Sequence, residues 1–230
     1  MLTGISFVRE SRPKALNPVS KFSFLQFLRD TAKVIRDRVA IAFLGILTLV
    51  VLVQGQFYGL FPIYAEKFVG ISSSEMGVSY ALEGAMMAIF SYFVSRWATR
   101  FNLITVYGIG AVLFSLAALG VGVMPSLTGI LVSYGVIEAF AEMFCTPSSK
   151  AIMASLSPGD QRGIYMGVLS LFQREAASYA PFIGGILMDL LAPNFLLFWC
   201  LFSAQGLIGA VLCLLLKKMA TRTLESRSTN

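Results

Sequence analysis

The sequence predicts an all-α membrane protein with six transmembrane helices, and three observations lead to that prediction. Hydrophobic residues make up 57% of the 230 residues and charged residues only 13%, about half of what soluble domains carry. Several charge-free stretches reach the roughly 20 residues that a helix needs to cross a bilayer. Lysines and arginines fall almost entirely on one side of these stretches, as expected of a multi-pass protein.

The first expected spans follow from charge-free runs and the residues that break them. Ser72, with Glu75 three residues later, forms a capping box and begins the second helix. The uncharged stretch 101–137 is too long for one span, so Gly120 and Pro125 divide it into a third helix and the start of a fourth. The first four expected spans are therefore 40–65, 72–95, and two that share 101–149.

The last two expected spans are bounded by clearer signals. Ser157 is the expected N-cap of the fifth helix, with Pro158 at its first position. Asp189 and Pro193 end that helix. The sixth helix follows over about 195–216.

Orientation follows from the basic residues. All 18 lysines and arginines except Lys67 and Arg174 lie on the same side of the six expected spans. Because cytoplasmic segments carry an excess of Lys and Arg, we expect both termini in the cytoplasm and a multi-pass location in the cell membrane.

Three parts follow along the chain. Residues 1–38 form a basic cytoplasmic leader, 39–217 a six-helix transmembrane domain, and 218–230 a cytoplasmic tail. Within the leader, 20–37 alternates apolar and charged residues, which indicates an interfacial helix on the cytoplasmic face. An ordinary solvated linker is the alternative for this segment.

The sequence lacks the residues that several classes of function require. The chain has no histidine, and its three cysteines lie in apolar runs without CxxC or metal-ligand spacing. It has no Walker loop, HExxH sequence or nucleophile elbow, and no basic-aromatic pattern typical of nucleic-acid binding. We therefore expect no enzyme activity, no resident cofactor or metal, and no nucleic-acid partner.

Five ionisable residues fall inside the expected spans. With a rise of 1.5 Å per residue, most of them lie about 18–20 Å from the nearest basic loop residue, close to the middle of the bilayer. A charge there costs about 2.5–3.5 kcal/mol if it faces lipid, so these residues must face protein or a water-filled cavity. They are Glu83, Glu138, Glu142, Arg174 and Glu175.

The only cation of this set is Arg174, and four carboxylates compete for it. Glu138 and Glu142 are four residues apart, so they share one face of the fourth helix with Tyr134. We expect Arg174 to pair with Glu138 or Glu142. One arginine cannot neutralise four carboxylates, so at least two of them must be protonated, bound to a cation or hydrated. Without histidine, they are also the candidate proton carriers of the chain.

Polar residues are shared unevenly among the expected helices. The second, fourth and fifth carry the charges, and the first carries Gln54 and Tyr58. The third and sixth carry only scattered polar residues. We therefore expect the first, second, fourth and fifth helices to line a polar cavity, with Gln54, Tyr58 and Tyr134 as contacts for a small solute.

Three segments resemble parts of the C-terminal half of major facilitator superfamily (MFS) transporters. SRWATRFN at 95–102, with Arg96 and Arg100, is similar to the family's Asp-Arg-x-Gly-Arg loop. SLSPGDQRGIYMG at 155–167, with Arg162, is similar to the segment that begins the family's eleventh helix. YAPFIGGILMD at 179–189 resembles the Pro-x-x-Gly-Gly stretch of that helix.

The resemblance implies two inverted three-helix repeats, which together form half of an MFS-type fold. Met-Gly-Val occurs at 76–78 and again at 166–168, near the starts of the second and fifth expected helices, with Glu83 and Gln173 at matching positions. The resemblance to the family also implies a cavity lined by the first, second, fourth and fifth helices, which agrees with the distribution of polar residues.

The predicted function is that of a secondary active transporter, as a half-transporter or C-terminal half, which moves a small solute by alternating access. Four acids against one base favour a cationic or proton-coupled solute. Its partners would be the lipid bilayer, the solute, and a second copy of the chain or a separate N-terminal half. The alternative is a non-transporting membrane scaffold or regulatory remnant of a transporter.

Overall fold

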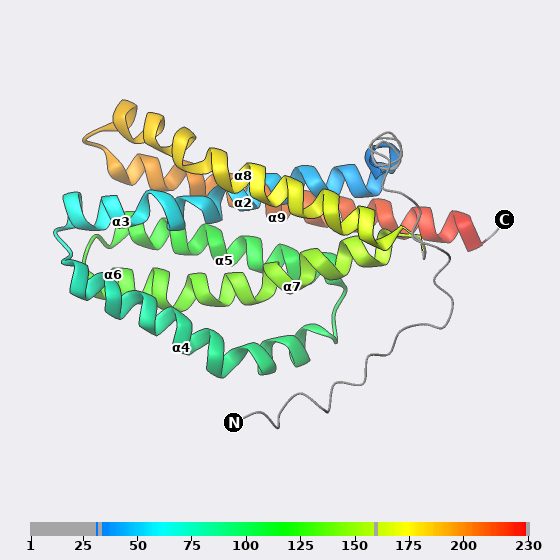
Figure 1. The fold of residues 1–230 in the computed structure, drawn as a ribbon, viewed down its shortest axis with the longest axis horizontal. Helices are drawn as coiled ribbons and strands as arrows, with labels where there is room; N and C mark the ends of the chain where they lie inside the picture. The colour runs from blue at the N-terminus through cyan, green and yellow to red at the C-terminus, as the bar shows by residue number, and fades with distance from the viewer. Residues whose placement is uncertain (1–30, 32–33, 159–160, 229–230) are drawn as a thin grey trace, which may run out of the picture.

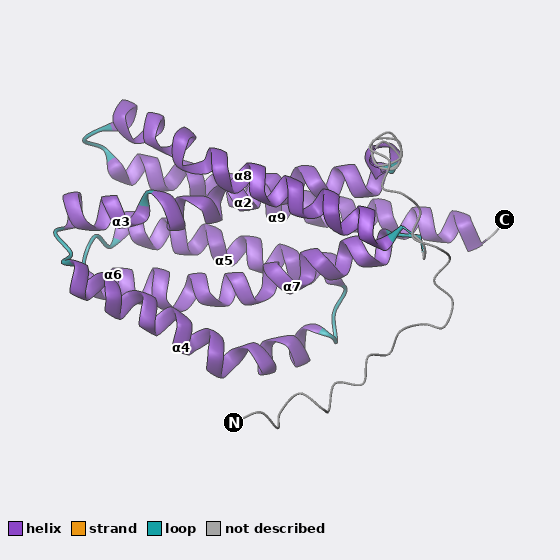
Figure 2. Ribbon diagram, in the orientation of Figure 1, coloured by secondary structure: helices purple, strands orange, loops and turns teal. Residues whose placement is uncertain are grey.

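The computed structural model describes residues 31, 34–158 and 161–228, and this part of the chain is helical without strands (Figure 2). The expected interfacial helix at 20–37 falls mostly outside these residues, as does the rest of the leader before it. Asp37 is described and caps the first long helix, accepting hydrogen bonds from the amides of Val39 and Ala40 at 3.0 and 3.2 Å.

The first half of the fold contains three long helical segments. The segment expected at 40–65 begins earlier and ends later, as α2, α3 and a π-helical turn, η1. The capping box at Ser72 and Glu75 is confirmed, and α4 follows it. The bounds are α2 Arg38–Gly59, α3 Phe61–Tyr64, η1 Ala65–Val69, α4 Ser73–Ala98 and α5 Leu103–Val123.

The second half also contains three long segments. The fourth expected span is one continuous rod made of α6, the π-helix η2 and α7. The sixth continues as a helix beyond the expected end at about 216, so α9 includes most of the segment expected as a cytoplasmic tail. The bounds are α6 Leu127–Ile130, η2 Leu131–Glu138, α7 Ala139–Leu156, α8 Arg162–Leu191 and α9 Phe195–Ser228.

The expected start of the fifth helix is wrong. Ser157 is the C-cap of α7, where its hydroxyl donates a hydrogen bond to the carbonyl of Ala154 at 2.9 Å. Helix α8 begins only at Arg162, with Gln161 before it. The signals of a helix start were present in the sequence, but α7 continues to Leu156 and uses Ser157 for its own end.

Five helical segments in the described residues are long and apolar enough to cross a membrane: Arg38–Gly59, Ser73–Ala98, Leu103–Val123, Leu127–Leu156 and Phe195–Lys218. Helix α8, the expected fifth span, is not among them although it has 30 residues. Gln173, Arg174 and Glu175 interrupt its apolar sequence near the middle. Six spans and an inverted repeat therefore stay predictions.

The helices run as a bundle whose connections alternate between two ends (Figure 1). The start of α2, the α4–α5 and α7–α8 connections and the end of α9 lie at one end. The η1–α4, α5–α6 and α8–α9 connections lie at the other. This arrangement places the basic loops together with both ends of the described chain.

Packing divides the bundle into a well-covered part and an exposed edge. Helix α5 packs against α9 and α7, and α2 packs against α8 and α9, whereas α4 contacts mainly α7 and η2. Most of the apolar window of α2 and α5 is buried, 61% in each, but only 11% of that of α4. Most of the surface of α4 therefore has no packing partner among the described residues.

Helices α2 and α8 approach closely because α2 carries two glycines one turn apart. A Cβ atom added at Gly59 would lie 2.5 Å from Cγ of Pro181, and one at Gly55 would clash with Cβ of Ala180. Small residues at this spacing let two helix backbones come together in a membrane. The contact also carries a hydrogen bond, because Gln56 donates its Nε2 to the carbonyl of Ala180 at 2.8 Å.

Candidate functional site

Helix α4 and the π-helix η2 bring the first part of the site together. Helix α4 starts at the capping box, in which the Ser72 amide donates to Oε2 of Glu75 at 2.8 Å, and it carries Glu83 two turns further on. The π-helix carries Tyr134 and ends at Glu138. Wide π-turns are rare in proteins and often occur at functional sites, and here one holds two of the predicted residues.

Three glutamates from three different elements converge at this place. One carboxylate oxygen each from Glu83 of α4, Glu138 of η2 and Glu142 of α7 lie within 4.8 Å of one another. We call these three residues the glutamate cluster. Three of the four predicted mid-span carboxylates thus lie together in the described part of the protein.

Two tyrosines orient the outer members of the cluster. The hydroxyl of Tyr134 donates to Oε2 of Glu83, and the hydroxyl of Tyr58 donates to Oε2 of Glu142, both at 2.5 Å. Tyr58 reaches across from α2 and is 53% exposed, so the cluster borders open space on that side. Each of these two glutamates keeps its second oxygen for another partner.

Glu138 differs from the other two members. It is fully buried, and neither of its carboxylate oxygens has a hydrogen-bond partner within the described residues. A buried polar group without a partner is costly, and a buried unpaired charge more so. A bound proton, a cation or a water molecule would therefore stabilise Glu138 at this position.

The separation of the three carboxylates sets a limit on their charge. Two unit charges about 5 Å apart repel by roughly 3 kcal/mol at an effective dielectric constant of about 20. Three such pairs would oppose full ionisation of the glutamate cluster by several times that amount. The cluster is therefore suited to take up positive charge.

The expected ion pair between Arg174 and the fourth helix is wrong. No ion pair joins Arg174 to Glu138 or Glu142 in the part of the chain that the structure describes, and both Glu138 oxygens lack a partner. Arg174 is exposed on α8, whereas Glu138 faces inward from η2. Matching depth along two helices does not bring side chains together when they lie on different faces.

The remaining predicted residues lie outside the cluster. Glu175 lines a mainly apolar hollow of about 420 Å³ between α2 and α8. Gln54 is half-buried, and no hydrogen bond joins it to the cluster within the described residues. Arg96 donates to the hydroxyl of Tyr92 at 3.4 Å. Arg96, Arg100 and Arg162 lie at the end of the bundle that holds the basic loops.

An aromatic cluster beside Tyr134 was not predicted from the sequence. The ring of Tyr134 stacks on Phe61 at a centroid distance of 4.7 Å and meets Tyr80 edge-on at 5.5 Å. Phe57 lies 6.1 Å from Tyr134 and 5.7 Å from Trp199. These rings fix the tyrosine that holds Glu83. Helical spacing of Phe57 and Phe61 is the only sequence signal for them, and it is equally typical of ordinary packing.

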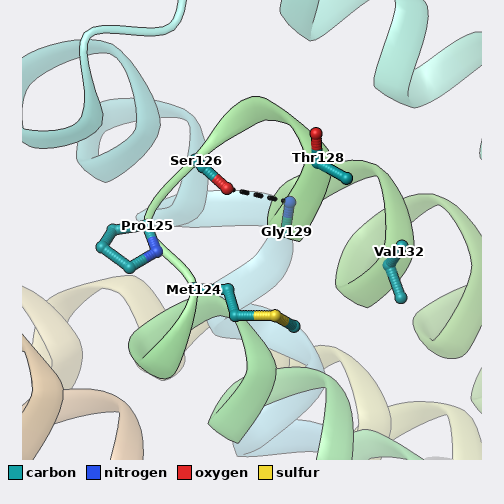
Figure 3. Close-up of a pocket in the computed structure, with 6 residues that line it drawn as sticks. All are labelled: Met124, Pro125, Ser126, Thr128, Gly129 and Val132. Carbon is teal, nitrogen blue, oxygen red and sulfur yellow. Dashed lines mark hydrogen bonds between the residues drawn. The ribbon is translucent and has the colours of Figure 1, made fainter.

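A second hollow lies at the α5–α6 turn and the start of η2. It measures about 380 Å³ and is lined by Met124, Pro125, Ser126, Thr128, Gly129 and Val132 (Figure 3). The hydroxyl of Ser126 accepts a hydrogen bond from the amide of Gly129 at 3.2 Å and caps α6. These residues form a turn at the end of the bundle and include none of the predicted site residues.

Comparison with known proteins supports this description. Two solved structures share the fold: crystal structures of a POT family transporter in complex with 5-aminolevulinic acid and with a thioalcohol-conjugated peptide. They match with TM-scores of 0.65 and 0.66 at 14% and 15% identity, covering 83% and 84% of this chain. Each match covers 45% of the solved chain, so this chain spans about half the length of these structures.

The sequence itself matches a protein family over most of its length. No curated protein matches it. The family described as Major Facilitator Superfamily matches residues 44–229, which include all of the long helical segments except the first residues of α2, and every residue of the glutamate cluster. The chain therefore belongs to the major facilitator superfamily of membrane transporters.

Proposed function

We propose that this chain is one six-helix half of a secondary active transporter that moves a small, positively charged solute by alternating access, coupled to protons. The observation that carries the proposal is the glutamate cluster. It places three carboxylates inside a membrane domain, without an ion pair in the described residues. Such a group binds positive charge, and binding that can be reversed from either side is what a coupled transporter needs.

The solute and the proton would compete for the same carboxylates. Glu138 is buried, whereas Glu83 and Glu142 are half-buried and Tyr58 is exposed beside them. In this proposal the exposed side admits the solute, and Glu138 holds the proton that the solute displaces. Glu83 and Glu142 lie beside Glu138, and Tyr134 and Tyr58 donate hydrogen bonds to these two glutamates.

Exposed charges on α8 support the proposal that this chain is only half of the transporter. Arg174 and Glu175 are exposed near the middle of α8, where facing lipid would cost each about 2.5–3.5 kcal/mol. Helix α4 is also largely uncovered. We propose that a second six-helix half, either another copy of this chain or a separate N-terminal half, covers these surfaces and encloses the cavity.

The proposed topology has six spans, with α8 as the fifth, and both termini in the cytoplasm of a cell-membrane protein. Its support is the gathering of the basic loops at one end of the bundle (Figure 1). Arg174 and Glu175 make α8 too polar to be counted as a span by composition, but they would lie against the second half rather than against lipid.

Uptake into proteoliposomes tests the proposal. The full chain would be reconstituted and given an inward proton gradient, with 5-aminolevulinic acid, a short peptide and small organic cations as labelled solutes. We expect accumulation of at least one cationic solute that a protonophore abolishes. Glu138→Gln should reduce this uptake at least tenfold, because it removes the buried carboxylate but keeps its size. Glu66→Gln, at an exposed position in η1, is the matched control and should transport normally.

The outcome that contradicts the proposal is equally specific. Unchanged gradient-driven uptake after Gln replacement of Glu83, Glu138, Glu142 and Glu175, one at a time, would exclude coupling through these residues. Absence of uptake for every solute, together with a strictly monomeric chain by cross-linking in the bilayer, would favour a non-transporting scaffold or regulatory protein.

A further inference from the structure

We propose that Glu83, Glu138 and Glu142 form a binding site for one divalent metal ion of the class that prefers oxygen ligands. The inference rests on the same cluster as the proposed function and specifies a ligand for it. The sequence alone predicted no metal site, because the three glutamates show none of the usual ligand spacings. Their convergence comes from three separate elements, α4, η2 and α7.

The size of the cluster fits such an ion. Oxygen ligands surround Ca²⁺ at about 2.3–2.6 Å, so two ligands on opposite sides of the ion are at most roughly 4.6–5.2 Å apart. The oxygens of the three glutamates lie within 4.8 Å of one another. Three atoms no more than 4.8 Å apart lie within about 2.8 Å of a common point, which is close to the Ca²⁺–oxygen distance.

Glu138 supplies the second, independent observation. It is fully buried and directed into the cluster, yet both of its oxygens lack a hydrogen-bond partner in the described residues. A carboxylate placed only for packing would be expected to have a donor in reach. Both oxygens of this buried carboxylate are therefore available to coordinate a cation.

The surrounding hydrogen bonds resemble the support that metal ligands need. Tyr134 and Tyr58 each hold one oxygen of Glu83 or Glu142, which fixes the carboxylates and leaves the second oxygen available. Hydrogen bonds of this kind orient ligands and are part of a metal site. Aromatic contacts to Phe61 and Tyr80 in turn restrain Tyr134.

The chemistry of the donors selects the class of ion. The cluster offers carboxylate and hydroxyl oxygens, and the chain has no histidine. Cys145 is buried, and its Sγ contacts the carbonyl of Tyr107 at 3.6 Å. Oxygen-only sites suit Mg²⁺, Ca²⁺ and Mn²⁺ rather than Zn²⁺ or Cu⁺. One divalent ion also balances two of the three carboxylate charges, which a single proton does not.

Direct binding of Mn²⁺ tests this site. The full chain, purified in detergent, would be titrated with Mn²⁺, and free Mn²⁺ would be followed by its electron paramagnetic resonance signal, with Ca²⁺ and Mg²⁺ as competitors. We expect one saturable site per chain. Glu138→Gln and Glu142→Gln should each weaken binding at least tenfold, whereas Glu66→Gln should leave it within twofold. Gel filtration and circular dichroism show whether each variant is folded, and if one glutamate variant is not, the other decides.

Absence of saturable binding of all three ions at millimolar concentration would overturn the inference. So would equal binding by the wild type and the folded Glu138 or Glu142 variants, because the ion would then sit elsewhere. The proposed function fails separately, in the uptake assay. Uptake without Mn²⁺ binding would remove only the metal site, and Mn²⁺ binding without uptake would remove only the transport proposal.

Discussion

Replacing Gly55 by alanine should destabilise the fold, whereas the same change at Gly45 of the same helix should not. The added Cβ at position 55 would clash with Cβ of Ala180 and lie 3.6 Å from the carbonyl of Ala177. Overpacking of this kind costs about 1–3 kcal/mol. The added Cβ at Gly45 would meet nothing within 4 Å, so that variant keeps only the roughly 1 kcal/mol gain in helix propensity.

The two variants should therefore differ in their free energy of unfolding by about 1–3 kcal/mol, since both gain the same helix propensity. Unfolding by SDS in mixed micelles, followed by the fluorescence of the two tryptophans, measures this difference. The double variant Gly55→Ala, Ala180→Gly removes the clashing methyl group. In the Gly55→Ala background, Ala180→Gly should thus cost about 1–2 kcal/mol less than in the wild type.

Equal stability of the Gly55→Ala and Gly45→Ala variants would refute the close approach of α2 and α8. It would also remove the basis for the hydrogen bond that crosses between these helices. Additive effects in the double variant would place the cost somewhere other than the contact with Ala180.

Three further changes test the caps and hydrogen bonds of the bundle. Ser72→Ala should lower the free energy of unfolding by about 1 kcal/mol because the helix cap is lost, and it should speed hydrogen exchange in the first turn of α4. The control Ser74→Ala, at an exposed position, should change neither quantity. Gln56→Leu should cost about 1 kcal/mol in the SDS assay through its lost bond to α8, whereas Gln54→Leu should stay within about 0.5 kcal/mol. Tyr134→Phe should cost about 1–2 kcal/mol, since one Glu83 oxygen loses its donor; an unchanged value would show that the hydroxyl does not stabilise the site.

The sequence predicted correctly the structural elements that depend only on residues close together in the chain. The capping box at Ser72 and Glu75 depends on residues three apart, and α4 starts where the pattern predicts. The start of α8 shows the limit of this reasoning. Ser157 and Pro158 carry the signals of a helix start, but the preceding helix continues to Leu156, and no local pattern tells whether a serine ends one helix or begins the next.

The candidate site shows the same division. Spacing along one helix predicted that Tyr134, Glu138 and Glu142 belong together, and they do lie in one region. Spacing says nothing about rotation between helices, and for that reason the predicted partner Arg174 was wrong. Glu83 joins the cluster from α4, and Tyr58 from α2. The π-helix that carries Tyr134 and Glu138 also has no recognisable signature in the sequence.

The sequence by itself determined that this is a helical membrane protein, because long apolar stretches are stable in a bilayer and charges there are costly whatever the packing. Only the tertiary structure decided which acids meet. It brought Glu83, Glu138 and Glu142 together and left Arg174 exposed on α8. The reason is that contacts between helices depend on how each helix is rotated and how closely it approaches its neighbours, and the spacing of residues along one helix does not fix either quantity.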